Sequence, residues 1–99
     1  MTIKVTTDNG REIHAPTVHL NGTHADHLID AYTTAAQAIQ TALDALREVT
    51  PNGRDYYPQG EDAERGANLD HRARNMAINN VRLEMLALAE HVANTRGAE

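Results

Sequence analysis

Apolar and polar residues alternate at the start of the chain, and this pattern predicts a β-hairpin. Ile3 and Val5 alternate with polar residues, and Ile13 and Ala15 do so again after the Asp-Asn-Gly segment at 8–10. Asn-Gly is a strong hairpin signal. A strict two-residue turn would divide the four apolar residues between two faces. A three-residue loop with its glycine in the left-handed conformation pairs Val5 with Ile13 and keeps all four on one face, so we favour a bulged hairpin.

A third extended segment is predicted after Pro16. Val18 and Leu20 alternate again with polar residues, which is the spacing of a short strand. Residues 1–22 are therefore predicted to form a short β-meander.

Helical spacing of apolar residues predicts a first helix over residues 23–49. Thr23 is a candidate N-cap, with Asp26 at the third helical position of a weak capping box. The main apolar row follows a heptad repeat: Leu28, Tyr32, Ala35, Ile39, Ala42, Leu46 and Val49. A second row is formed by Ile29, Ala36 and Leu43. The helix therefore has two apolar faces to cover.

A second long helix is predicted over residues 61–95, after a loop at 50–60 that begins with Pro51. Acidic residues in its first turn suit the positive end of a helix dipole. Its apolar residues form two neighbouring rows: Leu69, Ala73, Met76, Leu83 and Ala87, and then Ala77, Val81, Leu88 and Val92. Asn80 is in line with the first row, where it either sets the register of a helical interface or lies at a bundle edge.

These elements predict one domain over residues 1–99, of the α+β class but mainly α. The β-meander is followed by a long antiparallel helical hairpin. Two helices and a small sheet cannot cover four apolar rows, so we expect a homo-oligomer, a dimer or higher, that packs as a helical bundle.

Composition narrows the function. The net charge of −5 argues against DNA or RNA binding, which requires a basic surface. The chain has no Cys and no Ser, which excludes a serine or cysteine hydrolase, and it lacks the glycine-rich motifs of nucleotide enzymes. No apolar run approaches the roughly 20 residues of a membrane span. We therefore expect a soluble intracellular protein that is not an enzyme and has no cofactor.

The scarce aromatic residues fall in the predicted loop. The chain has no Phe or Trp, and two of its three Tyr are adjacent, at Tyr56 and Tyr57. In a rigid turn they are suited to stacking on a base, and Arg54 adds a bidentate anion donor. Arg65 and Arg72 are seven residues apart, so they share a helix face and would complete an anion-and-aromatic pocket. The alternative is that the tyrosines fold back as a lid over the helix ends.

Histidines near the start of the first helix form a weaker candidate site. They are His14, His19, His24 and His27, with Asp26 and Asp30 nearby. Two histidines and a carboxylate would suit zinc, but the spacing dictates no fourth ligand, so we expect no metal. Asn21, Thr23 or His24 is better placed to contact a phosphate at the helix start.

Two motifs, HLNGT at 19–23 and NGRDYYPQG at 52–60, resemble segments of small orphan proteins encoded by bacteriophages. In architecture the chain is similar to phage anti-defence proteins that sequester nucleotide immune signals of the Thoeris or CBASS type. The resemblance implies a protein of the host cytoplasm that binds a small phosphorylated nucleotide without catalysis. It also implies that Arg54, Tyr56, Tyr57 and Gln59 contact the ligand, with Asn21 and Thr23 as further candidates.

Two other functions fit the same sequence. A protein-binding inhibitor or adaptor would act through the acidic helical surface. A structural phage component would have its oligomer as its function.

Overall fold

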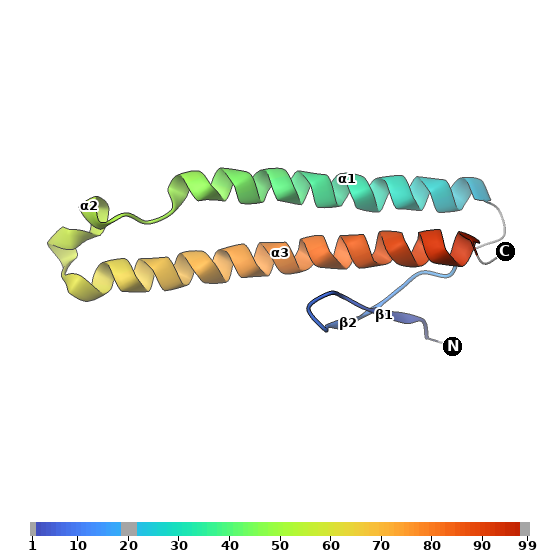
Figure 1. The fold of residues 1–99 in the computed structure, drawn as a ribbon, viewed down its shortest axis with the longest axis horizontal. Helices are drawn as coiled ribbons and strands as arrows, with labels where there is room; N and C mark the ends of the chain where they lie inside the picture. The colour runs from blue at the N-terminus through green and yellow to red at the C-terminus, as the bar shows by residue number, and fades with distance from the viewer. Residues whose placement is uncertain (1, 19–21, 98–99) are drawn as a thin grey trace.

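The computed structural model describes residues 2–18 and 22–97, which form a small β-hairpin and a long helical hairpin (Figure 1). The strands are β1 (Lys4–Thr6) and β2 (Glu12–His14), and the helices are α1 (Gly22–Leu46), α2 (Gly53–Tyr56) and α3 (Glu61–Gly97). Two 3₁₀ turns, η1 (Arg47–Val49) and η2 (Tyr57–Gln59), follow α1 and α2. Helices α1 and α3 run antiparallel, with α2 at the turn between them.

The β-hairpin has the predicted register and loop. Val5 pairs with Ile13 in an antiparallel ladder, and Gly10 has a φ of 85°. The Gly10 amide donates to the Thr7 carbonyl at 2.9 Å, and the Thr7 amide donates to the Arg11 carbonyl at 2.8 Å. The three-residue loop is therefore confirmed, and its left-handed residue is the glycine that tolerates this conformation.

The predicted third strand is wrong in the part of the segment that the structure describes. Residues 15–18 form no strand, and Leu20 lies outside the described residues. The proline nitrogen of Pro16 carries no hydrogen, so it cannot donate to a ladder. Its carbonyl instead accepts a hydrogen bond from Nε2 of His91 at 3.0 Å, which ties this segment to α3. The N-terminal unit is a two-stranded hairpin, not a meander.

Both long helices lie close to their predicted positions. Helix α1 begins at Gly22, so Thr23 lies inside its first turn, and the predicted N-cap at Thr23 is wrong because Gly22 itself is helical. The 3₁₀ turn η1 extends the helical path to Val49, as predicted. Helix α3 begins at Glu61, as predicted, and continues past residue 95 to Gly97.

The connection at 50–60 is not an irregular loop, because most of it winds into α2 and η2. Asn52 starts α2, since its Oδ1 accepts from the Asp55 amide at 3.1 Å. Gly60 ends η2 with φ 107° and ψ 167°, and this reversal directs the chain into α3. The connection is thus a compact helical tip.

The two apolar rows of α1 adjoin, forming one broad face that lies along α3. Ala25 and Ala36 on this face are buried, and Leu28, Ile29, Tyr32, Ile39 and Leu43 are partly buried. Among the α3 side chains that the structure describes, Leu88, Ala89 and Val92 are buried, and Val92 is wholly enclosed. The core therefore lies toward the end of the molecule that carries the β-hairpin.

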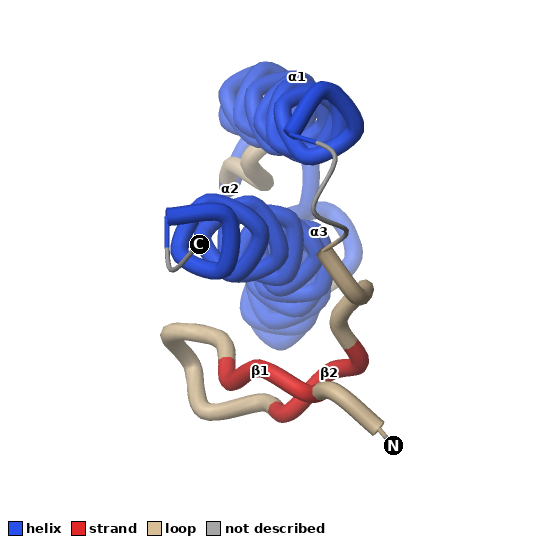
Figure 2. Tube along the Cα trace, turned by 90° about the vertical axis from the view of Figure 1, so that its right-hand side faces the viewer, coloured by secondary structure: helices blue, strands red, loops and turns tan. Residues whose placement is uncertain are grey.

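The molecule is a thin slab. Its principal extents are 62 × 24 × 14 Å, and viewed end-on α1, α3 and the β-hairpin lie one beneath another in a single layer (Figure 2). The radius of gyration is 18.6 Å, whereas a compact domain of about 100 residues has about 13 Å. Domains normally bury apolar faces between at least two layers. One layer leaves both broad faces of this slab open.

Candidate ligand-binding site at the helical tip

A groove of about 320 Å³ lies where α2 and η2 meet the first turns of α3. Its lining is Tyr56, Gln59, Asp62, Ala63, Gly66, Ala67, Asp70 and Arg74. The α3 residues 62, 66, 70 and 74 recur every fourth position, so they lie one above another on a single helix face. The groove thus has a helical floor and a wall supplied by the tip. We call it the tip groove.

Short local contacts hold the tip in place. A Cβ built on Gly53 would lie 3.1 Å from Oε2 of Glu64, so the α2 backbone lies close to the carboxylate of this α3 residue. On the other side, the Thr50 hydroxyl lies 3.3 Å from Nε2 of His71. Both contacts join the connection to α3, which positions the tip over the first turns of that helix.

The two adjacent tyrosines have different surroundings. Tyr56 is partly buried and lines the tip groove. Tyr57 is 75% exposed and is not among the lining residues, so it does not form a lid over the helix ends. Successive helical residues point about 100° apart, which separates the two rings. Of the pair, only Tyr56 lines the groove.

The arginine that lines the groove is Arg74, which the predicted set omits. Arg65 and Arg72 share a face of α3, as predicted, but neither lines the groove. Nη1 of Arg65 instead lies 3.4 Å from Oδ1 of Asp62. Arg74 is two residues beyond Arg72 and so points to nearly the opposite side of the helix. The signal that identifies Arg74 is the four-residue spacing from Asp62 and Asp70.

The remaining predicted residues include some that line the groove, one that lies outside it and two that the structure does not describe. The structure brings Tyr56 and Gln59 together in the groove, and it places Arg54 on the exposed surface of α2, outside the lining. Asn21 and the side chain of Thr23 lie outside what the structure describes.

The tip is mildly acidic. Between residues 54 and 74, four arginines stand against five acidic residues, a net charge of 4 − 5 = −1. Within the groove, Asp62 and Asp70 accompany Arg74. Carboxylates accept hydrogen bonds from hydroxyl and amino groups, whereas arginine donates to anions. The groove can therefore contact hydroxyl or amino donors, one anionic group and an aromatic face.

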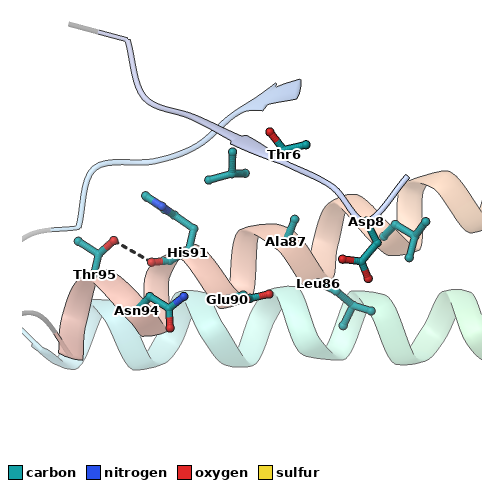
Figure 3. A pocket seen from close by; sticks show the side chains of 10 residues that line it. Thr6, Asp8, Leu86, Ala87, Glu90, His91, Asn94 and Thr95 are labelled. Carbon is teal, nitrogen blue, oxygen red and sulfur yellow. Dashed lines mark hydrogen bonds between the residues drawn. The ribbon is translucent and has the colours of Figure 1, made fainter. Parts of the chain in front are cut away.

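A second hollow, of about 250 Å³, lies between the β-hairpin and α3 (Figure 3). Val5, Leu83 and Leu86 supply apolar lining, while Asp8 and Glu90 supply carboxylates. We call this hollow the hairpin cleft.

The histidines near the start of α1 give no metal centre within the described residues. Across residues 2–18 and 22–97, no three His, Cys, Asp or Glu side chains are grouped to hold a metal ion. His19, a member of the predicted cluster, lies outside these ranges.

Comparison with known proteins provides no relative from which a function could be transferred. No protein-family model matches the chain, and searches of curated proteins and of solved structures found no match. In the described ranges, no helix has the length and apolar character needed to cross a membrane.

Proposed function

We propose that the protein is a phage accessory protein of the anti-defence type, which binds and sequesters a small phosphorylated nucleotide in the host cytoplasm without catalysis. The observation that carries this proposal is the tip groove, where Tyr56, Gln59 and Arg74 converge. The resemblance of residues 19–23 and 52–60 to phage proteins supports the same assignment.

Each lining residue has a defined role in this proposal. The ring of Tyr56 stacks on the base, and the amide of Gln59 hydrogen-bonds the base edge. Asp62 and Asp70 accept hydrogen bonds from ribose hydroxyls or a base amino group. Arg74 holds the phosphate. The groove has a volume of about 320 Å³. Ligand pockets span about 300–1,000 Å³, so this groove is at the small end of that range and would accept a small nucleotide.

Calorimetric titration with defined mononucleotides, dinucleotides and cyclic dinucleotides tests the proposal. A stacked base contributes about 1–3 kcal/mol, so Tyr56→Ala is expected to weaken binding about 5- to 150-fold. Arg74→Ala is expected to weaken binding of phosphorylated ligands more than that of the matching nucleosides.

The chain offers a matched control for each variant. Tyr57→Ala and Arg72→Ala remove the same side chains outside the groove and are expected to change affinity less than about threefold, which is under 0.7 kcal/mol. Equal losses in the two members of either pair would contradict the tip groove as the site, and so would the absence of binding for every nucleotide.

A second candidate function is a protein-binding inhibitor or adaptor. Leu69 and Met76 on α3 are each 59% exposed and lie on the same side of the helix. Large apolar side chains that are exposed next to one another often mark a protein-binding surface. The net charge of −5 suits a basic partner. This function predicts a stoichiometric complex with one host protein that Met76→Glu abolishes and Arg74→Ala leaves intact, the reverse of what nucleotide binding predicts.

A further inference from the structure

Helix α3 carries an exposed apolar row along one of the broad faces of the slab. Leu69 and Met76 are 59% exposed, Leu86 is 39% exposed, and Leu83 is partly buried. Residues 69, 76 and 83 are seven apart, and 86 follows three residues later, which is the spacing of a coiled-coil seam. At about 100° per residue, all four lie within about 100° of the helix circumference. We call these four residues the α3 seam.

Two hollows open along the same side of α3 as the seam. One is the hairpin cleft, which Leu83 and Leu86 line. The other lies between α1 and α3, has a volume of about 360 Å³ and is lined by Leu43, Asn75, Met76 and Asn79, among others. Their α3 residues run from 75 to 95, which spans about 30 Å at 1.5 Å per residue. This shape fits a straight helix lying along α3.

We infer that the α3 helix of a second copy of this chain occupies this face, packed antiparallel to the first with the two-fold axis near Asn79. In this arrangement Met76 of each copy packs against Leu83 of the other. The polar Asn79 at the axis fixes the register, as polar seam residues do. Asn80, the residue that the sequence suggested for this role, instead accepts a hydrogen bond from Asn9 at 2.8 Å and anchors the β-hairpin.

Charge distinguishes the antiparallel arrangement from the parallel one. Three charged residues occupy further positions of the same heptad repeat. Glu90 follows Leu83 by seven residues in the C-terminal half, and Arg65 and Arg72 precede Asn79 by 14 and seven residues in the N-terminal half. Antiparallel pairing places Glu90 of one copy between Arg65 and Arg72 of the other, whereas parallel pairing opposes Glu90 with Glu90. Opposite charges favour the first and like charges disfavour the second.

The exposed area is sufficient for a stable dimer. The chain exposes 7001 Å², whereas a compact monomer of its mass would expose about 5,600 Å². The surplus is about 1,400 Å², and a standard interface covers about 800 Å² on each partner. The chain as a whole therefore exposes enough extra surface to accommodate an interface of this size. Because Asp70 and Arg74 lie on other sides of α3, the dimer keeps both tip grooves open, and the inference is independent of the proposed ligand.

Light scattering on a sizing column tests the pairing. The wild-type chain is expected to have a mass of about 22 kDa, twice its 10.9 kDa. Met76→Glu is expected to run at the monomer mass with its helical circular dichroism retained, because Met76 is already exposed. Val81→Glu is the matched control, since Val81 is 45% exposed on the same helix but lies off the seam. A monomeric wild type, or a dimer that Val81→Glu disrupts and Met76→Glu does not, would overturn the inference.

Cysteine cross-linking then tests the direction, because the natural chain has no cysteine. A mixture of the single variants Met76→Cys and Leu83→Cys is expected to form the mixed disulfide in at least tenfold excess over either self-linked product. Self-linked products from each variant alone would show parallel pairing and contradict the inference. As a second test, Glu90→Arg and Arg72→Glu should each weaken the dimer several-fold, and the double variant should regain most of the loss.

Discussion

The tip depends on a backbone conformation at Gly60 that other residues rarely adopt, so Gly60→Ala should destabilise the protein. Gly60 has φ 107° and ψ 167°, and no atom lies within 4 Å of a Cβ built on it. Steric contact therefore contributes nothing, and the whole cost is backbone strain. An L-residue in this region costs about 1–3 kcal/mol.

Gly66 provides the matched control. It lies inside α3, and a Cβ built on it also meets no atom within 4 Å. Here the same substitution replaces a poor helix former with the best one, so Gly66→Ala should stabilise the protein by about 0.5–1 kcal/mol. The two variants should therefore differ by about 1.5–4 kcal/mol although they add the same methyl group six residues apart.

Urea unfolding followed by helical circular dichroism, at one fixed chain concentration, measures both free energies. Hydrogen exchange at the amides of Asp55 and Gly60 supplies a local readout, because the tip can open without global unfolding. A Gly60→Ala variant that matched the wild type in both stability and amide protection would contradict backbone strain at Gly60. A Gly66→Ala variant that destabilised α3 would contradict the expected gain in helix propensity.

Three further predictions concern the core, the β-hairpin and the surface charges. Val92→Ala should lower the free energy of unfolding by about 2–3 kcal/mol, because Val92 is 0% exposed, whereas Val81→Ala at a site 45% exposed should cost less than about 1 kcal/mol in the same urea assay. Asn80→Ala removes the acceptor for Asn9 and should cost about 0.5–1.5 kcal/mol while speeding amide exchange in β1 and β2 but not in α2; unchanged hairpin exchange would contradict the anchoring role. Glu12→Gln breaks the exposed 3.3 Å ion pair with Lys4 and should change stability by less than about 1 kcal/mol, and a larger loss would show that the pair is not an ordinary surface pair.

The parts of the fold that could be predicted from the sequence have local causes. The hairpin register follows from side-chain alternation together with one glycine able to adopt a positive φ. The helix ends near Val49 and Glu61 follow from Pro51 and from an acidic first turn. Each of these signals acts within a few residues, so periodicity and turn chemistry are enough to read it.

The tip groove could be predicted only in part, because the residues that line it depend on which side of α3 is covered by α2 and η2. The aromatic side chain of Tyr56 suggests it as a ligand contact, whereas Gln59 is implied only by the resemblance of residues 52–60 to phage proteins. The choice of Arg74 over Arg65 and Arg72 depends on which side of α3 the tip covers. That side is determined by the Asn52 cap and by the close approach at Gly53, neither of which has a periodic signature.

The prediction of a third strand is wrong for a related reason. Val18 and Leu20 have the spacing of a strand, but spacing does not reveal what a segment will bind. The hydrogen bond between His91 and the Pro16 carbonyl joins residues 75 positions apart. Such a contact appears only after the chain has folded.

Native mass spectrometry of the purified protein shows whether the tip groove binds a nucleotide, as we propose. The protein would be measured before and after incubation with a defined nucleotide mixture and with extract of nucleotide-signalling bacteria. We predict a retained mass of one nucleotide per chain, which Arg72→Ala preserves and Arg74→Ala loses. A chain that remains empty in both incubations, or an Arg74→Ala variant that retains the same mass, would contradict the claim.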